Sequence, residues 1–174
     1  MFLSPLQVVQ HVPIRSGMRI GDFGSGNGQH ALLLSERLQG EGSIYAFDWN
    51  SESIESLARE RARKNAQNLF SLCTDLNSHL PLKDRLLHCA LLSNTLHALS
   101  QRKEFLQELH RVLVDDGSVV FVDWAHSFNN MGPRAEDVLY PPDAVKLFES
   151  NGFSVGGMIP AGTHHYAFIA KKSA

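Results

Sequence analysis

The segment from Gly21 to Gly28 constrains the fold of this chain more than any other part of its sequence. It reads Gly-Asp-Phe-Gly-Ser-Gly-Asn-Gly and follows the short run Met18–Ile20. Glycines at alternate positions after a strand let the backbone turn sharply, approach a ligand closely and enter a helix whose first N–H groups point at that ligand. The segment therefore predicts a strand, a ligand-binding turn and a helix, which is the usual beginning of an α/β fold.

A carboxylate closes the next predicted strand. The segment Ser43–Phe47 ends in Asp48, twenty positions after Gly28, where nucleotide-binding α/β proteins place the acid that binds a ribose. The glycine spacing is G-x-G-x-G, and Gln29 stands where a dinucleotide-binding turn has its last glycine. Asp22 would repel a pyrophosphate but attract an ammonium group. We therefore expect a cationic nucleoside without phosphates, and a dinucleotide-dependent oxidoreductase is disfavoured.

Helical and strand-like segments alternate along the chain, as they do in a mostly parallel sheet covered by helices on both faces. The predicted strands cover residues 18–23, 43–47, 69–74, 86–92 and 118–122, followed by a closing antiparallel pair over 153–159 and 166–170. The predicted helices cover residues 4–12, 29–38, 51–65 and 143–150. A further helix is predicted after Ser100, which is expected to cap it. Asp115–Gly117 is predicted to be a turn.

The composition fits one domain over residues 1–174, with 43% hydrophobic and 20% charged residues. We expect an N-terminal helix or lid over 1–17 and a loop or lid over 125–142, where the sequence lacks a steady period. A formal net charge of -2 gives no basic footprint for nucleic acid. No signal peptide or membrane span is apparent, so a cytoplasmic location is expected. Cys73 and Cys89 lie in apolar runs and are expected to be buried free thiols.

The acid before G-x-G-x-G and the second acid at the end of the next strand resemble the class I methyltransferases that use S-adenosylmethionine. The order of elements extends this resemblance over essentially the whole chain. It implies an α/β three-layer sandwich: a seven-stranded, mostly parallel sheet with an antiparallel last strand and helices on both faces. The segments Leu91–Leu99 and Arg111–Asp123 most resemble the small-molecule branch that includes the quinone-biosynthesis methyltransferases.

By this resemblance, the glycines of the turn make room for the methionine part of the cofactor and Asp22 holds its ammonium group. Asp48 binds both ribose hydroxyls, Asp75 accepts from the adenine amino group, and the backbone after the fourth strand meets the methionine end. The residues assigned to the cofactor in this way are Asp22, Gly24, Ser25, Gly26, Gly28, Asp48, Trp49, Asp75, Leu76, Ser93 and Asn94.

The methyl group of a sulfonium is already activated, so only some acceptors need a general base. The candidate catalytic residues are His97 beyond the fourth strand and His126 beyond the fifth, with Asp123 near His126 in the sequence. The pair His164 and His165, followed by Tyr166, resembles the histidine–tyrosine ending of some relatives, in which one side chain borders the acceptor. Neighbours on a strand face opposite sides, so only one of the two histidines can do so. The histidines and cysteines show no metal-ligand spacing, so no metal site is predicted.

The sequence favours methyl transfer by in-line displacement to a small, partly apolar acceptor, with S-adenosylhomocysteine as the other product. The N-terminal helix and the loop 125–142 are expected to contact that acceptor. Their apolar side chains include Phe2, Leu3, Phe128, Met131 and Tyr140. Two alternatives stay open: a methyltransferase that acts on a protein or nucleic acid, and a module that binds S-adenosylmethionine without catalysis. The sequence leaves the oligomeric state open.

Overall fold

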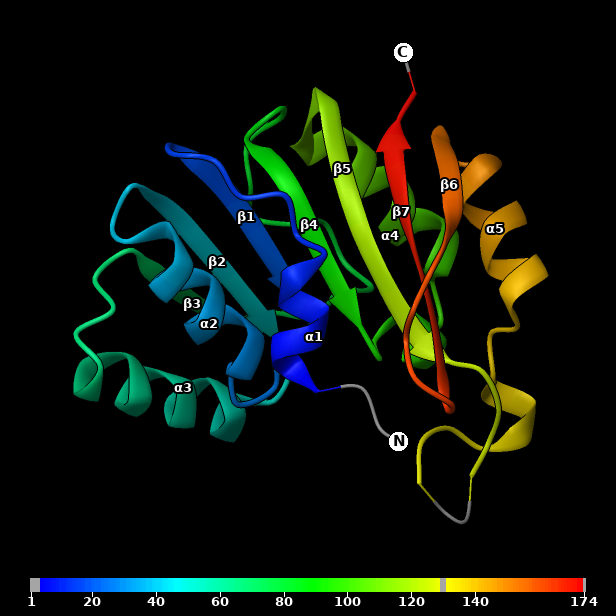
Figure 1. The fold of residues 1–174 in the computed structure, drawn as a ribbon, viewed down its shortest axis with the longest axis horizontal. Coiled ribbons are helices and arrows are strands. Elements are labelled where there is room, and N and C mark those ends of the chain that lie inside the picture. Colours follow the sequence, from blue (N-terminus) through cyan, green and yellow to red (C-terminus); the bar gives the residue numbers. More distant parts are fainter. Residues whose placement is uncertain (1–3, 129–130, 174) are drawn as a thin grey trace.

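A seven-stranded sheet with the order β3-β2-β1-β4-β5-β7-β6 forms the centre of the molecule (Figure 1). This computed structural model describes residues 4–128 and 131–173. The strands are β1 (Met18–Phe23), β2 (Gly42–Asp48), β3 (Leu69–Cys73), β4 (Leu87–Ser93), β5 (Leu113–Trp124), β6 (Phe153–Ile159) and β7 (His165–Lys172). Only β7 runs antiparallel to its neighbours β5 and β6, which confirms the predicted mostly parallel sheet with an antiparallel last strand.

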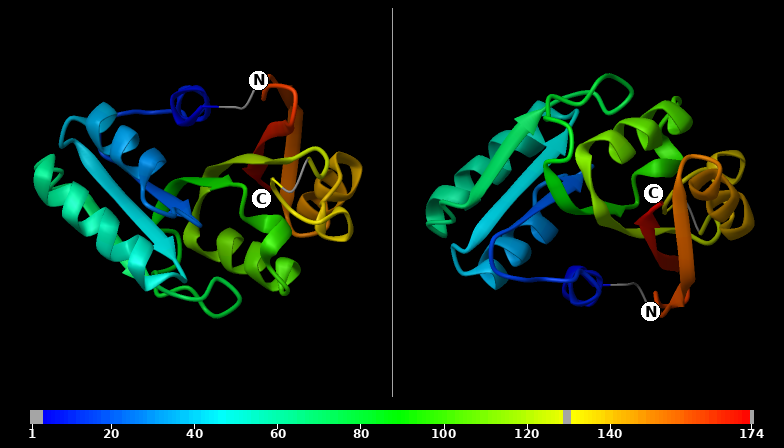
Figure 2. Two further views of the ribbon diagram at one scale, coloured as in Figure 1. Left: turned by 90° about the horizontal axis from the view of Figure 1, so that it is seen from below. Right: turned by 90° about the horizontal axis from the view of Figure 1, so that it is seen from above.

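Helices cover both faces of the sheet (Figure 2). One hydrophobic core joins the sheet to α1 (Pro5–Gln10), α2 (Gln29–Leu38) and α3 (Ser51–Arg63), and the other joins it to α4 (Arg102–Val112) and α5 (Pro141–Glu149). Two short 3-10 helices, η1 (Leu96–Ala98) and η2 (Ala135–Asp137), follow β4 and β5. Ser4 and Gln7 form a capping box that fixes the start of α1. The predicted three-layer arrangement is therefore confirmed.

Two local predictions were wrong. Ser100 does not cap α4, because its hydroxyl donates to Asn77 Oδ1 and Gln101 occupies the cap position. Asp115–Gly117 lies within the bounds of β5 rather than between elements. The pairing of β4 with β5 nevertheless shifts between Leu113 and Ser118, so the residues predicted as a turn form an irregular stretch inside the strand.

The two cysteines differ in their surroundings. Both are free, and Cys89 is buried in central strand β4, where burial raises its pKa to about 11. Cys73 is exposed, contrary to the expectation, because β3 is an edge strand with Phe70 and Leu72 also open to solvent. An apolar run on an edge strand therefore does not guarantee burial on either face.

The reversal of strand order between β1 and β4 determines where a ligand can bind. Chain order runs outward from β1 to β2 and β3 on one side, and from β4 to β5 on the other. In open α/β sheets the crevice beyond the carboxyl ends at such a switch point is the binding site. The acids Asp22, Asp48 and Asp123 all lie near these carboxyl ends. Within the described residues, no helix is both long and apolar enough to cross a membrane.

Candidate cofactor and catalytic site

A hollow of about 780 Å³ lies beyond the carboxyl ends of β1 to β4. Six residues assigned to the cofactor by resemblance line it: Gly24, Asp48, Trp49, Asp75, Leu76 and Asn94. Six further lining residues had no predicted role: Cys73, Thr74, Asn77, Thr95, Ala98 and Leu99. The other assigned residues, Asp22, Ser25, Gly26, Gly28 and Ser93, lie on the adjoining strand ends and in the glycine turn without forming this wall. We call this space the cofactor hollow.

Asp48 is held in one orientation by backbone donors from two loops. Its Oδ2 accepts from the Gly26 N–H at 2.7 Å, and its Oδ1 accepts from the Asn50 N–H at 2.9 Å. The side chain is buried but borders the cofactor hollow. Each carboxylate oxygen can accept a second hydrogen bond, so the fixed carboxylate presents two parallel acceptors to a diol.

The glycines of the turn, Gly24, Gly26 and Gly28, differ in what a side chain at each position would meet. A Cβ at Gly24 would overlap the side chain of Thr95, and a Cβ at Gly28 would overlap that of buried Leu57. At Gly26 a Cβ would meet nothing within 4 Å. All three have positive φ, between 52° and 80°. Only Gly26 therefore faces open space as expected, while the other two are required by packing inside the protein.

Asp22 is buried beneath this turn with one oxygen unsatisfied. Its Oδ2 has no hydrogen-bond partner among the described residues, although the carboxylate also receives a backbone hydrogen bond from Ala31. Burial, with a smaller contribution from the charge of Asp48, raises the pKa of Asp22 to about 7. A buried, unpaired carboxylate is costly unless a cation or a proton neutralises it. Asp22 therefore favours a proton or a cation beside it.

Thr95 connects the glycine turn to the end of β4. Its hydroxyl lies 2.9 Å from the Phe23 carbonyl and 3.1 Å from the Ser93 carbonyl, and it occupies the space that the missing Cβ of Gly24 leaves. Asn94, with φ of 56°, donates its N–H to the Val122 carbonyl. The sequence offered one signal for this role, a small hydroxyl side chain two residues after the end of a buried strand.

Asp123 is paired with His97 rather than with His126, its near neighbour in the sequence. His97 Nδ1 lies 2.6 Å from Asp123 Oδ1, and the His97 backbone N–H donates to Asp123 Oδ2 at 3.1 Å. The carboxylate is 0% exposed, whereas the His97 side chain keeps 14% of its surface open. The Arg102 guanidinium donates to the His97 carbonyl at 2.5 Å and holds the η1 backbone in place.

His126 lies in a separate group of rings at the carboxyl end of β5. Its Nε2 is 3.3 Å from His164 Nδ1, and the ring of Phe128 packs against that of His164. His165 instead packs against Trp124, and burial lowers its pKa. The three candidate catalytic residues are therefore divided, with His97 and Asp123 together and His126 apart.

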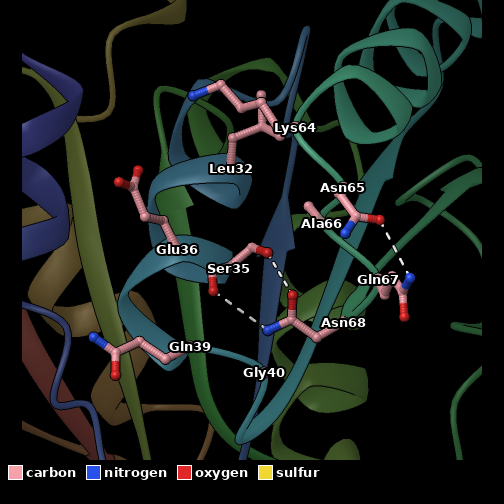
Figure 3. A pocket seen from close by; sticks show the side chains of 10 residues that line it. All are labelled: Leu32, Ser35, Glu36, Gln39, Gly40, Lys64, Asn65, Ala66, Gln67 and Asn68. Carbon is pink, nitrogen blue, oxygen red and sulfur yellow. Dashed lines mark hydrogen bonds between the residues drawn. The ribbon is translucent and has the colours of Figure 1, made fainter.

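A second hollow, of about 590 Å³, lies at the amino-end edge of the sheet between α2 and the turn 64–68 (Figure 3). Four of its polar side chains bind in two pairs: the Ser35 hydroxyl donates to Asn68 Oδ1 at 2.5 Å, and Gln67 donates to Asn65 at 3.2 Å. We call this space the amino-edge hollow. No cluster of three metal-ligating side chains occurs among residues 4–128 and 131–173.

Residues 20–117 match the family described as a methyltransferase domain. The chain belongs to this family. It is a methyltransferase domain of the class that uses S-adenosylmethionine, and the acid–glycine turn and Asp48 lie inside the matched range. The assignment made from these residues by resemblance is therefore confirmed at the level of the family.

The curated proteins with similar sequences include methyltransferases whose names refer to quinones. The domain is 29% identical over 127 residues to a 2-phytyl-1,4-naphtoquinone methyltransferase from Nostoc punctiforme, a match covering 72% of this chain and 54% of that protein. The chain thus spans about half the length of the curated relatives it matches. A crystal structure of a SAM-dependent methyltransferase from Aquifex aeolicus has a TM-score of 0.89 at 25% identity, covering 98% of this chain and 90% of that one.

A third similar protein shows that the fold alone does not identify the reaction. The [4+2]-cyclase SpnF superimposes with a TM-score of 0.85 at 15% identity, covering 98% of this chain and 80% of that one. A protein named as a cyclase therefore shares this architecture. The reaction has to be argued from the site, since one fold hosts several chemistries.

Proposed function

We propose that this protein transfers the methyl group of S-adenosylmethionine to a small, partly apolar acceptor. The observation that carries the proposal is the pairing of Asp48, a fixed two-oxygen acceptor at the cofactor hollow, with Asp22, a buried carboxylate lacking a partner for one oxygen. The first suits a ribose diol and the second an ammonium group. S-Adenosylmethionine carries both, together with a sulfonium that supplies an activated methyl group.

The remaining residues complete the binding of this cofactor. Trp49 is 76% exposed at the rim of the hollow and offers an aromatic surface to the adenine. Asp75 Oδ1 accepts from the N–H and the side-chain amide of Asn77, which fixes the carboxylate beside the hollow. Buried Leu76 supplies the apolar wall next to it.

The acceptor is proposed from the relatives and from the loop after β5. Their names point to naphthoquinone and related ring systems, and the loop presents Met131 and Tyr140 with 43% and 48% of their surfaces exposed. Phe128 pairs with Met131 through an isolated bridge. Phe2 and Leu3 lie outside the described residues. Reduced 1,4-naphthoquinone is therefore the first acceptor to test.

Calorimetric titration tests the cofactor half of the proposal. S-Adenosylmethionine and S-adenosylhomocysteine are expected to bind, NAD is not, and Asp48→Ala should abolish binding of both sulfur nucleosides. Binding of NAD alone would refute the proposal.

Transfer of labelled methyl to reduced 1,4-naphthoquinone tests the acceptor half. Alanine at Phe128, Met131 and Tyr140 should reduce turnover without weakening cofactor binding. Unchanged turnover in all three variants would remove the proposed role of this loop. Cofactor binding without transfer to any acceptor would favour the alternative of a binding module.

A further inference from the structure

The pair His97–Asp123 lies beside the cofactor hollow without lining it. His97 follows Asn94 and Thr95, which line that hollow, and precedes Ala98, which lines it as well. His97, Ala98 and Leu99 also line an adjoining space of about 670 Å³ between η1 and α5. His97 therefore borders this adjoining space, which shares Ala98 and Leu99 with the cofactor hollow.

Three N–H groups surround the Asp123 carboxylate. The His97 ring at 2.6 Å and the Trp124 backbone N–H at 2.9 Å share Oδ1, and the His97 backbone N–H approaches Oδ2. A carboxylate that accepts from Nδ1 keeps the proton on that nitrogen and leaves the lone pair of Nε2 free. Because the carboxylate is fully buried, its charge also stabilises an imidazolium when one forms.

Other charged and titratable groups lie around the pair. Arg102 from α4 donates to the His97 carbonyl, so its charge is bound to the backbone rather than to Asp123. From β7, Tyr166 donates its hydroxyl to the Leu139 carbonyl, and His165 is partly buried with a lowered pKa. Asp143 from α5 lines the adjoining space. The only ion pair that Asp123 makes among the described residues is with His97.

We propose that His97, oriented by Asp123, removes the proton from a phenolic or enolic hydroxyl of the acceptor as its oxygen is methylated. The inference rests on the proposed function. The oxygen–hydrogen bond breaks toward His97 Nε2, the oxygen forms a bond to the methyl carbon, and the carbon–sulfur bond breaks with its electron pair going to sulfur. The imidazolium then loses its proton to water, so atoms and charges balance.

The choice of a phenolic or enolic hydroxyl follows from acidity and from the walls of the adjoining space. A phenol is about three to four pKa units less acidic than an imidazolium, a gap that a base closes when proton and methyl transfer are concerted. Thiols of similar shape ionise near neutrality without help, and aliphatic alcohols are far less acidic. Leu99, Leu139 and Leu147 give the space an apolar side, and the rest of its lining is largely charged, with Arg102, Lys103, Glu104, Asp137 and Asp143.

Two ring acceptors that differ in one atom test the role of His97. We expect 1-naphthol and 1-naphthalenethiol to be methylated at pH 8 by the full chain with S-adenosylmethionine. His97→Gln should lower kcat for the naphthol at least about 100-fold, the usual contribution of a general base, while the thiol loses less than about threefold. Equal losses on both acceptors would show a structural role and overturn the inference. Transfer to neither acceptor would overturn the choice of acceptor class.

A second histidine–carboxylate pair provides the matched control. His79 Nδ1 lies 2.9 Å from Glu108 Oε2, but the His79 side chain is 73% exposed and lines none of these spaces. His79→Gln should leave both rates unchanged. A comparable loss of naphthol transfer in this variant would contradict the assignment to His97.

The tautomer of His97 gives a readout that does not depend on turnover. Nitrogen NMR of histidine-labelled protein should show that the neutral His97 ring carries its proton on Nδ1, and Asp123→Asn should shift the proton toward Nε2. In this proposal Asp123 is a positioning residue. The Asp123→Glu variant, which keeps a carboxylate, should therefore methylate the naphthol faster than the Asp123→Asn variant does. A proton on Nε2 in the unsubstituted protein would overturn the inference. Absence of cofactor binding by calorimetry would instead refute the proposed function, so the two failures are distinguishable.

Discussion

The cofactor hollow and the amino-edge hollow differ in whether the polar side chains near them have hydrogen-bond partners; on the cofactor side the decisive group is Asp22, which lies behind the wall of the hollow. In the amino-edge hollow Ser35 and Asn68 satisfy each other, as do Asn65 and Gln67 (Figure 3). At the carboxyl ends of the strands, a buried oxygen of Asp22 has no partner among the described residues. Unsatisfied or preorganised polar groups identify a binding site better than volume does.

The largest effect that separates the two hollows is expected at Asp48. Asp48→Ala removes the proposed acceptor for two ribose hydroxyls and also frees the Gly26 and Asn50 N–H groups. Two hydrogen bonds to a charged group are worth about 3–6 kcal/mol, so the Kd for S-adenosylmethionine should rise more than about 100-fold. Calorimetry measures the change. An affinity within tenfold of the original would contradict the assigned role.

The glycine turn provides a comparison within the cofactor site itself. Gly28→Ala places a methyl group against Leu57 in a left-handed backbone, and should lower the free energy of unfolding by about 2–4 kcal/mol. Gly26→Ala meets no protein atom and should cost about 1–2 kcal/mol from its backbone conformation alone. Urea unfolding of both variants measures the difference. Equal losses would show that packing against Leu57 is unimportant.

A pH dependence is expected from Asp22, whose pKa of about 7 in the folded protein lies above the ordinary 3.8. The folded state holds this proton more tightly, so the contribution of Asp22 to stability is greatest below pH 3.8 and is lost as the pH rises through 7. Compared with the unsubstituted protein, Asp22→Asn should therefore gain stability as the pH rises to 8. Thermal unfolding of both proteins between pH 4 and 8 tests the sign, and a constant difference would contradict it.

The same carboxylate should couple cofactor binding to proton release. At pH 6 the ammonium group of S-adenosylmethionine displaces about one proton from Asp22. Titrations in buffers of different ionisation heat measure that proton. 5′-Methylthioadenosine, which lacks the ammonium group, serves as the control and should release none.

The smallest effect is expected in the amino-edge hollow. Ser35→Ala leaves Asn68 without a hydroxyl donor and should lower the free energy of unfolding by about 1 kcal/mol. The Kd for S-adenosylmethionine should be unchanged, because this hollow lies at the opposite end of the strands. A weakened cofactor affinity in this variant would undo the distinction between the two hollows.

The features predicted correctly from the sequence are those that local chemistry determines. The strand before Gly24, the sharp glycine turn and the acid at the end of β2 follow from residue type and spacing alone. The partners of Gly24 and Gly28, which are Thr95 and Leu57, come from other elements and leave no local signal.

The catalytic pairing and the edge strand show the same limit. The sequence put Asp123 beside His126, whereas packing of η1 against β5 brings it to His97. The exposure of Cys73 depended on the position of β3 in the sheet, which the strand's own composition does not reveal. Distances along the chain therefore predicted which groups reach the carboxyl edge but not which of them meet.

The position of β7 has a consequence for how the chain folds during synthesis. β7 follows β6 in the sequence but lies between β5 and β6, pairing with β5 from Ser118 to Trp124. Until β7 is in place, β5 has an open edge and β6 has no partner in the sheet. The edge of β5 must therefore stay unpaired until β7 inserts between β5 and β6. During folding this exposed edge is the part of the sheet most open to pairing with another chain.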